Sequence, residues 1–187
     1  MVQTPVRALT LEEFLQQPET KPASEYIDGQ VVQKDMPKAD HGIVQAELVT
    51  AMNNALKPGK QGRPISELRC TFGDRSIVPD ITVLPWSSIP RHENGKAAGE
   101  LSIAPPWIIE ILSAEQSQTK VFKKIQHALE HGTQLGWLID PAEDCVLVYT
   151  PDLRTVLYEA ADTQLPVPEF AAAFQLTVGE LVAWLYE

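Results

Sequence analysis

Apolar residues recur along the chain with two spacings, one typical of helices and the other typical of strands. Polar caps that precede apolar stripes predict four helices. These helices are predicted at Leu9–Gln16, at Ala39–Leu56, between Ser113 and Gly132, and at Leu176–Tyr186. The residues expected to cap three of them are Thr10, Ser113 and Thr177.

Strand-like runs lie between these helices. Asp28-Gly29 is a strong turn signal, which predicts a hairpin over Glu25–Asp35. The apolar run Trp107–Leu112 is typical of a strand that is covered on both faces. Further strands are predicted at Ile65–Phe72, Ser76–Leu84, Leu135–Ile139, Cys145–Tyr149 and Thr155–Tyr158, and a loop at Ile89–Ala104. This order predicts a single α/β domain over residues 1–187, with helices against a mixed sheet.

Composition fits this picture. The chain has 187 residues, 44% of them hydrophobic, so that it can bury a core without covalent cross-links. The two cysteines, Cys70 and Cys145, are expected to be reduced. No apolar run reaches the roughly 20 residues that span a bilayer, and the initial MVQTPVRALT lacks a signal-peptide core. We therefore expect a soluble, cytoplasmic protein with no membrane partner.

Two acidic residues lie in apolar runs that are predicted to be buried. Glu110 occupies the middle of Trp-Ile-Ile-Glu-Ile-Leu, and Asp80 follows Val78-Pro79. Burying one ionised carboxylate alone costs on the order of several kcal/mol or forces the group to take up a proton. Each acid therefore requires a cation, a metal ion or several hydrogen bonds. If the two strands are neighbours, the acids could converge on one cation.

Two converging carboxylates suit Mg²⁺ or Mn²⁺, because these hard ions take oxygen ligands and Mg²⁺ usually keeps several waters. The remaining positions accept a phosphate oxygen and a water molecule, whose pKa the metal lowers. In the alternative, structural interpretation, Glu110 pairs with a Lys or Arg side chain and Asp80 is a turn residue at a strand edge. The spacing of the acids leaves both interpretations open.

The helix that follows Glu110 offers a cation. At about 100° per residue, with Val121 at zero, its apolar stripe spans about −20° to +100°. Lys124 then lies at about −60°, at the border of the stripe, where it can reach along the sheet toward the carboxylates. The alternative for Lys124 is a boundary lysine that packs its aliphatic stem and leaves its charge in water.

An ordered set of short motifs extends this interpretation. The set comprises Glu25-Tyr-Ile-Asp28-Gly29, His41 at a helix start, Pro79-Asp80, Ile109-Glu110-Ile111-Leu112-Ser113, Lys124, and Gly132 with Trp137-Leu-Ile-Asp140-Pro141. From about Leu9 to Leu185 the chain thus resembles the PD-(D/E)XK nuclease superfamily. More closely, it resembles a bacterial family of putative restriction endonucleases, long classed as a domain of unknown function.

The resemblance implies a restriction-endonuclease-like fold, in which helices flank a central mixed β-sheet. It implies that Asp80 and Glu110 bind Mg²⁺ or Mn²⁺, helped by the main-chain carbonyl of Ile111. In the superfamily, a lysine two residues after the glutamate assists the attacking water. That position is Leu112 here, and the related family uses a lysine on the following helix, which is Lys124 in this sequence.

Two further residues enter through the resemblance. Glu25 is expected near the site as an additional acid. His41 is expected to be a metal ligand, a phosphate contact or a structural group. The implied function is a Mg²⁺-dependent endonuclease that hydrolyses phosphodiester bonds of DNA. By analogy with enzymes that cut both strands of a duplex, a homodimer is expected.

The alternative function is a binding or interaction module that keeps the nuclease fold and has lost catalysis. The net charge of −10 favours it, because nucleic-acid binders are usually basic. Lys120 and Ala128 also favour it, since they stand where the family tends to have an acid and a tyrosine. A small basic cluster, at Lys57, Lys60 and Arg63, is either a solvated loop or a contact for the DNA backbone.

Overall fold

The structure is a computed structural model that describes residues 9–186; residues 1–8 and 187, which belong to the predicted domain, lie outside the described part. The elements in chain order are α1 (Leu11–Leu15), β1 (Ser24–Ile27), β2 (Gln30–Gln33), α2 (Ala39–Leu56), β3 (Gly62–Ser66), β4 (Arg69–Phe72), β5 (Arg75–Ile77), β6 (Ile81–Pro85), η1 (Trp86–Ser88), β7 (Glu100–Leu101), β8 (Trp107–Ile111), α3 (Gln118–Glu130), β9 (Leu135–Asp140), β10 (Cys145–Tyr149), β11 (Thr155–Tyr158), η2 (Glu169–Ala171), α4 (Val178–Ala183) and η3 (Trp184–Tyr186).

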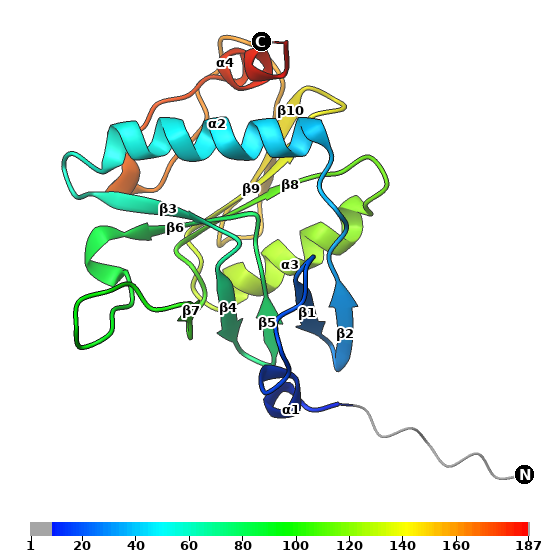
Figure 1. Cartoon of the computed structure of the whole chain (residues 1–187). Helices are drawn as coiled ribbons and strands as arrows, with labels where there is room; N and C mark the ends of the chain where they lie inside the picture. Colours follow the sequence, from blue (N-terminus) through cyan, green and yellow to red (C-terminus); the bar gives the residue numbers. More distant parts are fainter. Residues whose placement is uncertain (1–8, 187) are drawn as a thin grey trace, which may run out of the picture.

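A six-stranded sheet, in the order β11-β10-β9-β8-β6-β3, forms the centre of the molecule. It is mixed, because β8 and β9 are parallel and its other neighbours are antiparallel. The helix α3 makes the connection that parallel strands require between β8 and β9. Helices cover both faces, with α2 above the sheet and α3 below it in Figure 1.

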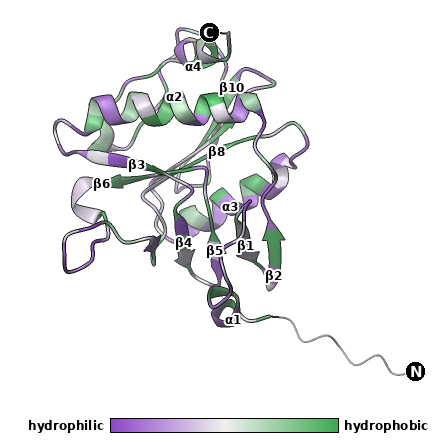
Figure 2. Ribbon diagram, viewed as in Figure 1, coloured by the Kyte–Doolittle hydropathy of each residue, from purple (hydrophilic) through white to green (hydrophobic). Residues whose placement is uncertain are grey.

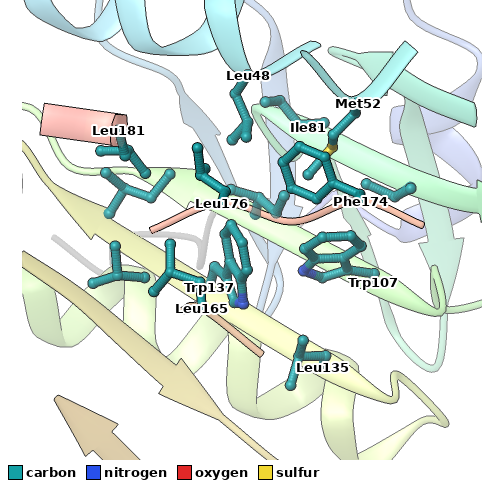
Figure 3. Packing of buried hydrophobic residues seen from close by; sticks show 14 of the residues in the cluster. Leu48, Met52, Ile81, Trp107, Leu135, Trp137, Leu165, Phe174, Leu176 and Leu181 are labelled. Carbon is teal, nitrogen blue, oxygen red and sulfur yellow. The ribbon is translucent and has the colours of Figure 1, made fainter. Parts of the chain in front are cut away.

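The larger apolar core lies between the six-stranded sheet, α2 and the C-terminal segment. In Figure 3 the rings of Trp107 and Trp137 lie side by side, and their centroids are 4.8 Å apart at an interplanar angle of 77°. Leu48 and Met52 of α2 and Phe174 cover them. Figure 2 shows the central strands β6 and β8 as hydrophobic, which agrees with burial on both faces.

The alternation of side chains along β8 sets the position of Glu110. Trp107, Ile109 and Ile111 join the core on the α2 side, whereas Ile108 joins a second core between the sheet and α3. Successive side chains of a strand point to opposite faces, so Glu110 shares the α3 side with Ile108. This face is where Lys124 was expected to lie.

A second, five-stranded sheet follows the order β2-β1-β5-β4-β7, and it corrects the predicted strands. The run predicted at Ile65–Phe72 divides into β3 and β4, and the run at Ser76–Leu84 divides into β5 and β6, so each run passes from one sheet to the other. At the first break Glu67 has a φ of 52°, and at the second Pro79 has no N–H for a strand ladder. The predicted loop at Ile89–Ala104 contains β7, which pairs with β4.

The predicted helices are present, with one boundary corrected. Thr10 and Thr177 cap their helices as expected, and each forms a capping box with the glutamate three residues later. The helix expected to start after Ser113 begins at Gln118 with Ser117 as its N-cap. The Ser113 N–H instead donates to the Gln116 side chain within a local turn, at 3.4 Å. None of the helices between residues 9 and 186 is both long and apolar enough to cross a membrane.

Candidate functional site

The structure brings the five predicted side chains together from five different segments. Glu25 lies on β1, His41 near the start of α2, Asp80 just before β6, Glu110 on β8 and Lys124 on α3. All five are buried. Because they gather where β1, α2, β6, β8 and α3 meet, the site depends on the packing of both sheets.

The register between β6 and β8 explains why the two acids converge. Ile81 lies opposite Ile109 in this antiparallel pair, and the same register continued by one residue places Asp80 opposite Glu110. Cross-strand neighbours point their side chains to the same face. Asp80 was predicted inside a strand, but it lies in the irregular segment between β5 and β6. This break leaves its backbone free to bend, while β6 holds the next residue in the sheet.

Asp80 is surrounded by donors. Its Oδ1 accepts from the ammonium of Lys34 at 2.7 Å. Its Oδ2 accepts from the backbone N–H of Ile111 at 2.7 Å and lies 3.1 Å from His41 Nε2. Gln45 donates to the Asp80 carbonyl at 2.8 Å. Burial would raise the pKa of the Asp80 carboxyl, but His41 and Lys34 outweigh it and hold the pKa well below its usual range.

Lys124 lies between two carboxylates: Glu110, toward which its place on the helix was expected to direct it, and Glu25. Its Nζ is 3.0 Å from Glu25 Oε1 and 2.9 Å from Glu110 Oε1. Glu25 Oε1 also accepts from the Val78 N–H at 2.7 Å, which ties β1 to the segment before Asp80. Lys124 is therefore an ion-paired group inside the protein, and not a boundary lysine with its charge in water.

Burial acts in opposite directions on the pKa values of Glu110 and Lys124, and the charge of each partner opposes that effect. Burial and, to a smaller extent, the negative charge of the neighbouring Asp80 raise the pKa of Glu110 to about 8. The positive charge of Lys124 opposes both effects. For Lys124, burial opposes the charge, but Glu110 and Glu25 together raise the pKa of the ammonium. Lys124 keeps Glu25 as a partner when Glu110 takes up a proton. We conclude that burial favours the protonated form of Glu110, while the neighbouring carboxylates favour the charged form of Lys124.

Lys34 completes the cluster, although the sequence did not single it out. It follows β2 directly, and its ammonium contacts Asp80, Glu67 and the carbonyl of Val78. Burial opposes its charge, but Asp80 and other acids raise the pKa of Lys34. The sequence signal was weak, because a lysine at the end of an exposed hairpin strand is typical of a solvated surface.

His41 faces Asp80 through a ring nitrogen, and Ile111 approaches Asp80 through its N–H in place of the expected carbonyl. His41 places Nε2 against Asp80, and its buried Nδ1 has no hydrogen-bond partner among the described residues. Ile111 contacts Asp80 through its N–H. The contribution of the Ile111 carbonyl as a metal ligand stays a prediction.

The donor set fits a hard divalent cation. Glu110 Oε1 is buried and accepts no well-aligned hydrogen bond from the described residues, although the Lys124 ammonium is close to it. A metal ion would satisfy this oxygen. Within residues 9–186, no three side chains of His, Cys, Asp or Glu converge as a metal-binding group. Mg²⁺ does not need such a group, because it is commonly held by one or two carboxylates and several waters.

A cleft of about 660 Å³ opens beside the cluster. Asp80, His41 and Lys34 line it, together with Lys21 and Arg69. Glu110, Glu25 and Lys124 do not line it; they are buried behind Asp80. A ligand in this cleft would therefore meet Asp80 and Lys34 first.

Comparisons with known proteins agree over most of the chain. The family described as Uma2, "Putative restriction endonuclease", matches residues 11–179. Among solved structures, the chain is similar to the crystal structure of a putative nuclease belonging to DUF820 from Anabaena variabilis ATCC 29413, with 54% sequence identity and a TM-score of 0.91. That similarity covers 94% of this chain and 98% of the other. No curated protein matches the chain.

Proposed function

Since the chain belongs to the Uma2 family of putative restriction endonucleases, we propose that it is a Mg²⁺- or Mn²⁺-dependent nuclease that hydrolyses phosphodiester bonds of DNA. The observation that carries the proposal is the convergence of Asp80 and Glu110 with Lys124 beside them. A buried group of this kind, next to a cleft, is the usual form of a site whose chemistry depends on shifted pKa values.

In this proposal Asp80 and Glu110 hold the divalent cation. When bound, the metal polarises a phosphate oxygen and lowers the pKa of a water molecule. The remaining work belongs to residues of the chain. Before the metal binds, Lys34 and His41 keep Asp80 charged, and the Ile111 N–H fixes the orientation of its carboxylate.

Lys124 supplies a fixed positive charge behind the acids. Glu25 holds its ammonium at 3.0 Å, and Glu25 is itself held by the Val78 N–H. A preorganised cation stabilises negative charge that develops on a phosphate without having to rearrange during the reaction. Lys124 therefore orients the attacking water and stabilises the phosphate, and Glu25 positions Lys124.

The proposal is tested by nicking of supercoiled plasmid DNA in the presence of Mn²⁺. Wild type is compared with Glu110→Gln and Lys124→Ala, and with Lys120→Ala as a control on an exposed lysine one turn earlier in α3. We expect at least a hundredfold loss in the first two variants, the order of effect when a transition-state contact is removed, and near-wild-type nicking in the control. Equal nicking in all four proteins would reveal a contaminating nuclease.

Metal binding gives a second test that does not depend on catalysis. Calorimetry should detect Mn²⁺ binding to wild type at millimolar concentrations or below, and the Asp80→Ala variant should bind much more weakly. Absence of binding to wild type would remove the basis of the enzyme proposal.

Two observations favour a second candidate, the binding module without catalysis. Lys34 already pairs with Asp80, so this carboxylate is not left without a cation when no metal is bound. The net charge of −10 also disfavours the binding of a polyanion such as DNA. In this case Mn²⁺ would neither bind nor stabilise the protein. The calorimetric comparison therefore separates the two candidates.

We also propose that the protein acts as a homodimer. The strand β2 is an edge of the five-stranded sheet, and it exposes Val31 and Val32 by 45% and 41%. An unpaired edge with apolar residues is prone to pair with another chain. Light scattering of the purified protein measures the mass directly, and a monomer at all concentrations would contradict this part of the proposal.

A further inference from the structure

The Lys34 ammonium occupies a position, surrounded by oxygen atoms, in which a metal ion would be expected to bind. Its Nζ lies 2.7 Å from Asp80 Oδ1, 2.9 Å from the Val78 carbonyl oxygen and 3.1 Å from both carboxylate oxygens of Glu67. Every one of these contacts is with oxygen. The side chain is only 12% exposed, so the ammonium is held largely away from bulk water.

The position of Lys34 is built into the fold. Its backbone N–H donates to the Ala23 carbonyl at 2.9 Å, which extends the pairing of β1 and β2. An ammonium has three protons to donate, and Asp80, Val78 and Glu67 accept all three. Such a complete set of acceptors indicates a specific site for a cation, in contrast to a mobile surface lysine.

The ammonium and a divalent ion would compete for the same oxygen. His41 and the Ile111 N–H both contact Asp80 Oδ2, so a metal ion would bind Oδ1. In the structure the Lys34 ammonium occupies that position. Mg²⁺ binds oxygen at about 2.0–2.1 Å. Two like charges at one carboxylate oxygen repel each other strongly where water is scarce. Metal binding therefore requires Lys34 to withdraw from Asp80.

The cleft beside Asp80 provides space into which the Lys34 ammonium can move. Lys34 lines the cleft together with Lys21 and Arg69, and the lining also includes the acids Glu19, Asp35, Glu67 and Asp80. Arg69 is already paired with Glu19 at 2.6 Å, so Lys21 and Lys34 are the cations that an anion in the cleft would meet. A substrate phosphate that formed an ion pair with the Lys34 ammonium would free Asp80 Oδ1 from its contact with Lys34. By linkage, an anion that draws Lys34 away from Asp80 favours the metal, and the metal favours the anion to the same extent.

We propose that Lys34 is a resident cation that competes with the divalent metal for Asp80, and that it couples metal binding to occupation of the cleft by a phosphate group. The inference rests on the proposed metal-dependent function of the same site. Lys34 is a positioning residue in this scheme, because it acts on the metal through Asp80.

Calorimetry with Mn²⁺ alone tests the competition on the full chain without DNA. Lys34→Met keeps the length of the side chain and removes its charge, and we expect it to bind Mn²⁺ about tenfold more tightly than wild type or better, a change well resolved by this method. Lys34→Arg keeps the charge and should bind no more tightly than wild type. Lys120→Met removes an exposed lysine from α3 and is the control for net charge.

Melting curves in EDTA and in Mn²⁺ provide a readout independent of activity. Lys34→Met should melt below wild type in EDTA, since Asp80 loses its partner, and it should gain more from Mn²⁺ than wild type does. If Lys34→Met does not fold, Lys34→Gln is the replacement, with the same expected order of affinities.

The outcomes separate this inference from the proposed function. Equal or weaker Mn²⁺ binding by Lys34→Met would overturn the competition, and the nuclease proposal would stand if wild type binds metal and nicks DNA. Binding by Lys34→Met but not by wild type, in the absence of nicking, would support the competition and reject the nuclease. Absence of binding in all variants would reject both.

Discussion

At the scale of single residues, the buried charges of the site do not balance. Asp80, Glu110 and Glu25 bring three carboxylates, whereas Lys34 and Lys124 bring two ammonium groups into contact with them. Glu110 accommodates the excess, because burial raises its pKa to about 8. A bound divalent cation would also remove the imbalance. The metal-free protein should therefore be sensitive to the protonation of this one residue.

We expect Glu110→Gln to stabilise the metal-free protein at alkaline pH. The pKa of Glu110 is raised on folding from an ordinary 4.5 to about 8, so its ionisation costs stability. This cost appears as the pH rises above 4.5 and is complete above about pH 8. Glutamine cannot ionise, so its advantage over wild type should grow between about pH 5 and about pH 9, by up to roughly a few kcal/mol.

Urea denaturation in EDTA across this pH range measures the effect. The exposed Glu143→Gln is the control, and its difference from wild type should stay nearly constant with pH. A constant difference for Glu110→Gln as well would mean that Lys124 keeps Glu110 ionised throughout.

The sequence identified most of the side chains that gather here. Apolar surroundings pointed to Asp80 and Glu110, helix geometry pointed to Lys124, and the family resemblance added Glu25. Lys34 escaped notice, because its contacts join β2 to residues more than thirty positions away, and no local pattern carries such information. The catalytic and metal-binding roles of these residues stay predictions.

At the scale of elements, periodicity predicted the helices and the strand-like runs but not the sheet to which each run belongs. Two runs that read as single strands each divide between the two sheets. The breaks lie at Glu67 and at Pro79. Pro79 gave a visible signal, whereas the left-handed Glu67 did not, because a non-glycine residue adopts that conformation only when tertiary contacts hold it there. The break at Pro79 is what places Asp80 beside the cleft.

Close packing of α3 on β9 positions Lys124, and Gly136 makes it possible. A Cβ atom at Gly136 would overlap Cγ2 of Ile125, the residue next to Lys124. We expect Gly136→Ala to lower the free energy of unfolding by about 1–3 kcal/mol, as overpacking does. Plasmid nicking should fall as well, because α3 must shift and take Lys124 with it.

Denaturation with and without a compensating change measures this packing. Ile125→Ala removes the overlapping methyl group, so the double variant should lose less stability than the sum of the two single variants. Gly99→Ala, where a Cβ would meet nothing within 4 Å, should be nearly neutral. Strict additivity of Gly136→Ala and Ile125→Ala would show that the two residues do not limit the approach of α3.

At the scale of the whole molecule, the fold is restriction-endonuclease-like, as the sequence predicted, and the net charge is unusual for the DNA-cleaving function that we propose. The net charge is −10, and three of its basic side chains, Lys34, Lys124 and Arg69, are committed to buried or half-buried ion pairs. The cluster of Lys57, Lys60 and Arg63 lies at the other end of α2 from His41. Sixteen residues of helix separate Lys57 from His41, or about 24 Å.

The lysines at the rim of the cleft are therefore the better candidates for phosphate contacts. Lys21 lines the cleft, and the exposed Lys38 follows the lining residue Pro37 in the sequence and pairs with Glu115 at 3.1 Å. We expect the double variant Lys21→Gln/Lys38→Gln to bind a duplex of about six base pairs more weakly than wild type. The slope of log K against log salt should become less steep by about two units, because each phosphate contact contributes about 0.9 to this slope.

The triple variant of the remote cluster, with Lys57, Lys60 and Arg63 changed to Gln, is the comparison. A duplex of about six base pairs spans roughly 20 Å, which is too short to reach from the cleft to Lys57. This variant should therefore keep the wild-type salt dependence on the short duplex. All measurements are made in a Glu110→Gln background, where the proposed cleavage is blocked. A larger effect of the remote cluster would mean that DNA binds along α2, away from the cleft that Asp80 and Lys34 line.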